Sequence, residues 1–267
     1  MWWPAWLLAL WVSCAVTVIS GCTVLEDRSQ CACSVTLHFD GLQEGELYWM
    51  MTCSDPGRQP QSGMLEEGVG MLELELVRGR WRLLCVQSDC PAFLTSEGFS
   101  VKEGDPFPAL YAGSLLLDAC GEEYCDSVRL HREHAVVHVS LRDLYSTDLS
   151  YEIAGDVCGL GVDGKPLDGP FRTRLDVSEG GLSLVNLPRQ GSSDGLRLEI
   201  FSETDSEGRS TRALVRSFAL GEYIRASGFD WYAPDLDELS LEVDYTRTVV
   251  TVFPDEWHQT LEFDLSL

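Results

Sequence analysis

The chain has 267 residues, of which 43 are acidic and 19 are basic, and its formal net charge is −24. A charge of this sign and size argues against binding to nucleic acid or adsorption to anionic lipid, because both would repel it. Beyond the first residues, no stretch is apolar for long enough to cross a bilayer. We therefore expect no nucleic acid among the partners of this chain.

The first 21 residues have the features of an export signal. They carry no charged side chain, and the apolar run from Trp6 to Val18 suits a signal peptide but is short for a transmembrane span. The run ends in Val18-Ile19-Ser20-Gly21-Cys22, in which an aliphatic residue and small residues precede a cysteine. This pattern predicts cleavage between Gly21 and Cys22 and lipidation of the Cys22 thiol. The alternative interpretation is a signal anchor or a buried N-terminal helix.

From residue 31 onward, apolar and polar residues alternate, which is typical of half-buried strands. The alternating apolar positions include Val35, Leu37, Phe39, Leu72, Leu74, Leu76, Trp81, Leu83, Cys85, Val128, Leu130, Val137 and Val139. Clusters of Gly, Asp, Ser and Pro separate these runs. Helical periodicity is weak, with one short turn expected at residues 222–226. The chain is therefore expected to be all-β.

Eight cysteines remain once Cys14 is removed with the signal and Cys22 is acylated. They are Cys31, Cys33, Cys53, Cys85, Cys90, Cys120, Cys125 and Cys158. An even number of cysteines in an exported chain predicts disulfides, although their connectivity does not follow from the sequence. The rival interpretation is zinc bound through two Cys-x4-Cys pairs, but this spacing is loose for a zinc site. We expect disulfides, with no metal and no other cofactor.

Three strand patterns of the first half recur in the same order in the second half. The patterns that begin at Val35, Trp81 and Val128 recur from Leu149, Leu196 and Leu241, at a nearly constant offset of about 114 residues. This recurrence predicts two tandem copies of one β-sandwich. The predicted organisation is a signal peptide at 1–21, a tether at 22–30, an N-terminal β-sandwich domain at 31–145 and a C-terminal β-sandwich domain at 146–267.

A further strand pattern follows the second copy. Its apolar residues are Leu261, Phe263, Leu265 and Leu267, and the same offset aligns it with the first strand of a further copy. One interpretation is a closing strand of the C-terminal domain. The other is a donor strand, residues 261–267, that completes the sheet of a partner subunit.

No pattern of catalytic residues is present, and we expect no enzyme. The sequence has no Gly-x-Ser-x-Gly elbow, P-loop or His-Glu-x-x-His motif. On a strand, His134 and His138 would face one way and His131 the other, so the three histidines would not meet at a metal ion. Four aromatic residues form a candidate sugar-stacking platform, although large aromatics in a β-sandwich are more often core residues. They are Trp81, Trp231, Tyr232 and Trp257.

Several short motifs resemble one family. Cys22 is followed by Glu26-Asp27 and by a strand over residues 33–39. Further along come Leu110-Tyr111-Ala112-Gly113, two strand patterns at 128–132 and 135–139, a strand at 151–155 with a Gly/Pro-rich loop, and the terminal strands. Together these stretches resemble the anchor and minor-subunit lipoproteins of type V fimbriae. The uncharged N-terminus and the high cysteine count depart from that family.

The resemblance implies two transthyretin-like β-sandwich domains and assembly by strand exchange. Stalk subunits of such fimbriae are exported as lipoproteins and trimmed at an arginine, and a neighbour's strand then fills the vacated groove. An anchor subunit keeps its lipid and fixes the fibre to the outer membrane. The implied partners are fimbrial stalk or accessory subunits and, through the lipid on Cys22, the outer membrane.

The resemblance also implies a role for Arg28, the only basic residue between Cys22 and the first strand. Arg28 is the candidate protease site and is expected to stay uncut in an anchor. The alternative function is a surface-exposed lipoprotein that binds a glycan or another ligand and belongs to no polymer.

Overall fold

The computed structural model describes residues 31–90, 93–142, 149–178, 181–191, 195–206, 209–244, 249–254 and 261–264. Strands arranged in four sheets dominate this part of the chain, which confirms the predicted all-β class. None of the helices within these residues is both long and apolar enough to span a membrane.

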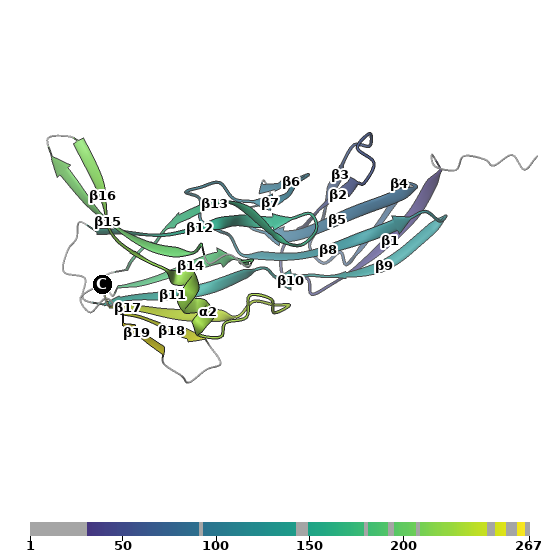
Figure 1. Ribbon diagram of the computed structural model, residues 1–267. Coiled ribbons are helices and arrows are strands. Elements are labelled where there is room, and N and C mark those ends of the chain that lie inside the picture. Colours follow the sequence, from purple (N-terminus) through teal and green to yellow (C-terminus); the bar gives the residue numbers. More distant parts are fainter. Residues whose placement is uncertain are drawn as a thin grey trace, which may run out of the picture.

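Two of the sheets are built from the first half of the chain and lie on the right in Figure 1. In the three-stranded sheet, β1 (Ala32–Asp40) lies between the antiparallel β4 (Met71–Val77) and the parallel β9 (Glu123–Arg129). The second sheet has the strand order β10-β8-β5-β2-β3. Its strands are β2 (Leu47–Cys53), β3 (Gln61–Leu65), β5 (Gly79–Ser88), β8 (Leu110–Ala119) and β10 (His131–Arg132).

The alternation in the sequence reappears as the core between these two sheets. Val35 and Leu37 of β1 are fully buried, as are Leu83 and Cys85 of β5, and Trp81 is nearly so. Because successive side chains of a strand point to opposite faces, each of these strands contributes every second residue to one hydrophobic cluster.

The other two sheets come mainly from the second half of the chain. One has the order β14-β11-β17-β18-β19 and the other has the order β16-β15-β12-β7-β6, with β13 also paired to β12. The strands of the first are β11 (His134–Arg142), β14 (Leu182–Pro188), β17 (Glu238–Asp244), β18 (Val249–Pro254) and β19 (Leu261–Asp264). Those of the second are β6 (Leu94–Thr95), β7 (Gly98–Ser100), β12 (Leu149–Gly161), β13 (Pro166–Arg174), β15 (Arg197–Ser206) and β16 (Arg209–Phe218).

A short helix covers part of the second core. It is α2 (Leu220–Ala226), in agreement with the turn expected at 222–226, and it buries Leu220, Tyr223 and Ile224. These residues belong to a second hydrophobic cluster, which extends from Leu84 to Val252.

Sheet positions repeat in the two halves, but not in the predicted alignment. β11 lies between β14 and the parallel β17, just as β1 lies between β4 and the parallel β9. The offset of about 114 residues instead aligns β1 with β12. Alternation has the same period in every strand, so it does not distinguish neighbouring strands. β11, which the predicted boundary at residue 145 assigns to the first domain, pairs with strands of the second half.

A segment between β5 and β8 joins the two halves. β7 pairs with β12, and Phe99 and Val101 lie in the second hydrophobic cluster. The two strands approach closely at Gly159, where an added Cβ would lie 1.9 Å from the Phe99 carbonyl oxygen.

We expect Gly159→Ala to destabilise the fold by about 1–3 kcal/mol, because β7 must move to admit the methyl group. Gly191→Ala is the matched control, since a Cβ there would meet nothing nearer than 3.9 Å. Urea unfolding of both variants checks the difference. Equal stabilities would contradict the close approach of β7 and β12.

Candidate functional site

The two segments that the sequence marks as connections lead to opposite ends of an elongated molecule. In Figure 1, β1 starts at the right-hand end, whereas β18 and β19 lie at the left-hand end. The chain that precedes β1 carries the predicted lipidation site, and β19 begins the candidate donor strand. A connection made at one end is therefore well separated from a connection made at the other.

Part of the candidate donor strand is visible as β19. Residues Leu261–Asp264 pair antiparallel with β18 of the same chain, from Val252 opposite Leu261 to Val249 opposite Asp264. This pairing corresponds to the closing-strand interpretation. Leu265 and Leu267 lie outside the described residues. β19 is an edge strand of four residues, so a short ladder holds it to the sheet.

The predicted N-terminal site residues, Gly21, Cys22 and Arg28, also lie outside the described residues. The strand that follows them is well defined. β1 begins at Ala32, and Cys33, Val35 and Leu37 are fully buried. Arg28 therefore precedes β1, and a cut at Arg28 would leave the whole of β1 attached to the rest of the chain.

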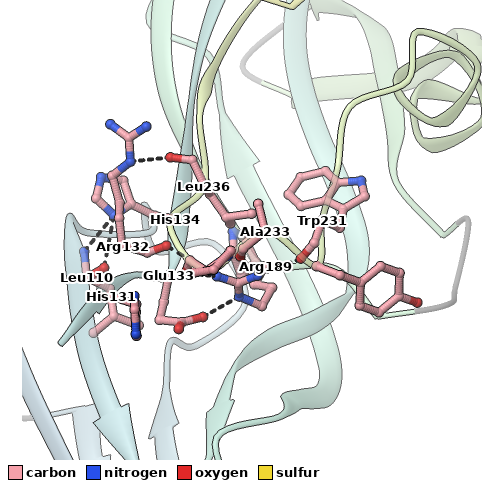
Figure 2. Close-up of polar contacts among 12 residues, drawn as sticks. Leu110, His131, Arg132, Glu133, His134, Arg189, Trp231, Ala233 and Leu236 are labelled. Carbon is pink, nitrogen blue, oxygen red and sulfur yellow. Dashed lines mark hydrogen bonds and ion pairs between the residues drawn. The ribbon is translucent and has the colours of Figure 1, made fainter. Parts of the chain in front are cut away.

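Between the two ends, the nearly buried side chain of Arg189 contacts both the connection between β10 and β11 and the loop before β17 (Figure 2). Arg189 follows β14, and its Nη1 donates to the Trp231 and Ala233 carbonyl oxygens at 2.6 and 2.7 Å. Its Nη2 donates to the Pro234 carbonyl at 2.9 Å, and its Nε donates to the Glu133 carboxylate.

Glu133 sits in the connection between β10 and β11, so Arg189 joins this connection to the loop before β17. The Arg189 and Glu133 side chains are 11% and 12% exposed. Burial raises the pKa of the Glu133 carboxyl above its ordinary value, and the Arg189 guanidinium opposes that shift. The sequence did not point to this contact, because three of the acceptors are backbone carbonyls more than 40 residues away.

The three histidines contact different groups. His131 Nδ1 lies 3.4 Å from Asp235, and His138 Nε2 lies 3.3 Å from Glu238. His134 is buried, and its Nδ1 accepts a hydrogen bond from the Leu110 backbone N–H at 3.0 Å (Figure 2). No cluster of three or more metal-ligating side chains forms among the residues that the structure describes.

Burial lowers the pKa of His134 below its ordinary value of 6.5, and the Arg132 charge adds to this shift. Near and below pH 6.5, the unfolded chain therefore binds a proton at His134 that the folded chain does not bind. The free energy of unfolding falls as the pH drops below that value. We expect His134→Gln to weaken this pH dependence. Urea unfolding at about pH 7.5 and about pH 5.5, with the exposed His38→Gln as control, checks it. An unchanged pH dependence would contradict the assignment.

The cysteines correct the sequence prediction, because all eight are free thiols. Cys33, Cys85 and Cys158 are buried and fill core space as small apolar side chains. Burial also raises the pKa of the Cys85 thiol.

We expect iodoacetamide to modify the exposed Cys31, Cys120 and Cys125 of the folded protein well before it modifies the buried cysteines. Mass spectrometry of peptides from timed samples checks the order. Protection of all three exposed thiols in the unreduced protein would instead indicate disulfides.

The predicted aromatic platform is not assembled. Trp81 belongs to the core of the first half, whereas Trp231 is buried in the second core and packs edge-on against Phe229 at 4.8 Å. Tyr232 is 74% exposed, and Trp257 lies outside the described residues.

A surface hollow of about 560 Å³ lies over β11, β14 and β17. Its lining includes His138, Asp176, Glu242 and the exposed Leu182 and Leu184. The hollow combines carboxylates, an imidazole and apolar side chains on the outer face of one sheet. The hollow could not be predicted from the sequence, because its residues come from three strands and a loop.

Comparison by sequence finds no family model and no curated protein that matches the chain. Comparison of structures finds the fimbrial anchor protein Mfa2 from Porphyromonas gingivalis, with a TM-score of 0.60 and 10% identity over 87% of this chain and 99% of that one. A candidate polysaccharide-binding protein from Bacteroides thetaiotaomicron has a TM-score of 0.57 and 14% identity over 86% of this chain and 98% of that one. A candidate adhesin from Bacteroides ovatus has a TM-score of 0.55 and 15% identity over 86% of this chain and 96% of that one. Over most of its length, the chain therefore shares its fold with a fimbrial anchor protein and with these two Bacteroides proteins.

Proposed function

We propose that this chain is a structural subunit of a cell-surface fimbria, namely the lipid-anchored subunit that attaches the fibre to the outer membrane. The observation that carries the proposal is the position of the two connections. The segment from Cys22 enters the fold at the start of β1, and the candidate donor strand leaves it at the opposite end (Figure 1). A molecule that links a membrane to a fibre needs this separation.

The domain organisation forms part of the proposal. The proposal of two tandem transthyretin-like sandwiches is supported by two hydrophobic clusters. Beside each cluster, one strand lies between an antiparallel and a parallel neighbour: β1 in the first half and β11 in the second. The shared fold with the Mfa2 anchor protein supports the same organisation. In this proposal the division between the two domains lies before β11, because β11 pairs with β14 and β17 of the second half.

The proposed mode of attachment is strand complementation through residues 261–267. An edge strand held by a ladder of four residues can leave β18 at modest cost and pair with a neighbour's open sheet instead. The neighbour gains hydrogen bonds for backbone groups that would otherwise be unpaired.

The proposed anchor keeps its lipid, and the position of Arg28 supports this. A protease that cuts at Arg28 would remove the lipid but would leave β1, which begins at Ala32, attached to the rest of the chain. In the proposed anchor, such a cut would therefore cost the chain its lipid while β1 stays in its sheet.

Purification of surface fibres followed by mass spectrometry tests the proposal. The expected result is that this chain copurifies with the fibres and that its N-terminal peptide begins at acylated Cys22. A fibre-bound chain that begins at Ser29 would replace the anchor with a released subunit. Absence from the fibres would reject a fimbrial role.

A second candidate function is ligand binding by a surface lipoprotein outside any polymer. It is favoured by the hollow over β11, β14 and β17 and by the fold shared with the candidate polysaccharide-binding protein. A glycan array probed with the chain, beside a variant in which Leu184 is replaced by Lys, distinguishes this function. Binding that the variant loses would support it.

A further inference from the structure

A tether between a membrane and a fibre is a tension-bearing part, so the direction of force through its strands matters. If the proposed function holds, tension enters from Cys22 at the N-terminal end of β1. It leaves the first half at the C-terminal end of β9, through the connection that leads to β11 (Figure 1).

β1 and β9 are neighbours and parallel, with Ser34 opposite Glu123 at one end of the ladder and Asp40 opposite Arg129 at the other. Pulling β1 by its N-terminal end and β9 by its C-terminal end slides the two strands along each other. This geometry loads all the hydrogen bonds of the ladder together, whereas pulling both strands at the same end opens them one after another.

Backbone hydrogen bonds extend the ladder at both ends. At the end where tension enters, the Ser34 N–H donates to the Glu122 carbonyl at 2.8 Å. At the far end, the Leu130 N–H donates to the Asp40 carbonyl, also at 2.8 Å. The ladder therefore has no frayed end at which separation could begin.

Two further features hold β1 in place. Its other edge pairs with β4 over seven positions, so β1 is the central strand of its sheet. Its inward side chains Cys33, Val35 and Leu37 are fully buried against the facing sheet. Sliding β1 would break two ladders and pull three apolar side chains through the core.

We propose that the parallel β1–β9 pair is the shear clamp of this protein, the element that bears tension between the membrane and the fibre. β3, a free edge of the first half, does not lie on this path. The clamp resists forces along the long axis of the molecule and gives way readily to forces across it.

Force spectroscopy on the folded chain tests the clamp without any fibre. The mature chain carries Cys22→Ser to prevent lipidation and receives two handles through azide-bearing residues, because its native thiols exclude cysteine coupling. Handles at Ala32 and Arg129 load the pair in shear. Handles at Ala32 and Glu123 load the same hydrogen bonds by peeling, and all three positions are exposed.

We expect the rupture force in shear to be severalfold higher than the force in peeling at the same loading rate. Similar forces in the two geometries, or a lower force in shear, would overturn the clamp. The result does not depend on fibre copurification, so the clamp and the anchor function can fail separately. Circular dichroism of both handle variants before pulling confirms that each one is folded.

Discussion

Replacement of Arg189 by alanine is expected to destabilise the protein by about 3–5 kcal/mol, because it leaves the buried Glu133 carboxylate without its partner. Three backbone carbonyls, of Trp231, Ala233 and Pro234, lose their donor in the same step. The Glu133 side chain is 12% exposed and the contacts to Trp231 and Ala233 are partly buried, so water replaces the guanidinium poorly at these groups. Urea unfolding with a tryptophan fluorescence readout measures the loss.

Two control variants separate the roles of charge and geometry. Arg189→Lys keeps the charge but cannot supply donors in several directions, so we expect most of the loss to remain. Arg142→Ala removes an ion pair with Glu242 at 2.8 Å, but Arg142 is 62% exposed. Its expected cost is below about 1 kcal/mol. If Arg189→Ala and Arg142→Ala cost similar amounts of stability, the contacts of Arg189 would not contribute to stability as proposed.

Two contacts connect the first and second halves of the chain. The Arg189 guanidinium joins the connection between β10 and β11 to the loop before β17, and β7 crosses from the first half to pair with β12. Both contacts oppose bending at the division between the halves. In the proposed anchor, these contacts would help to transmit tension from the first half to the second.

Strand positions could be predicted from the sequence because one face of each strand is buried. Val35, Leu37 and Leu83 alternate with polar residues, and they are fully buried in the structure. The neighbours of each strand could not be predicted in this way. The alternation pattern aligned β1 with β12, whereas it is β11 that, like β1, lies between an antiparallel and a parallel neighbour.

The polar contacts that hold the fold together were less visible than its core. Arg189 donates to backbone carbonyls. Every residue has a backbone carbonyl, so no pattern of side chains predicts which ones Arg189 contacts. Cysteine number suggested disulfides, but the burial of Cys85 within β5 is a packing feature that a count does not reveal. The histidines were predicted not to converge, and each of the three has a different partner.

Deletion of residues 261–267 is expected to abolish attachment of the fibre to the cell surface while the lipoprotein itself stays in the outer membrane. β18 keeps its pairing with β17 in this variant, so the fold should persist with one edge strand fewer. Thermal unfolding of the purified variant checks that it does. Surface fibres are measured by comparing the fibre protein on washed cells with that shed into the medium.

Single substitutions sharpen this experiment. Phe263→Asp interrupts the apolar alternation of the candidate donor strand and should release fibres nearly as well as the deletion, because a buried carboxylate is costly in a neighbour's groove. Glu262→Gln is the matched control one residue away, on the polar side of the same alternation, and should leave attachment intact. Fibres that stay attached to cells carrying the deletion would reject donation by this strand. Shedding under Glu262→Gln as well would show that attachment depends on the charge of the strand and not on its apolar side.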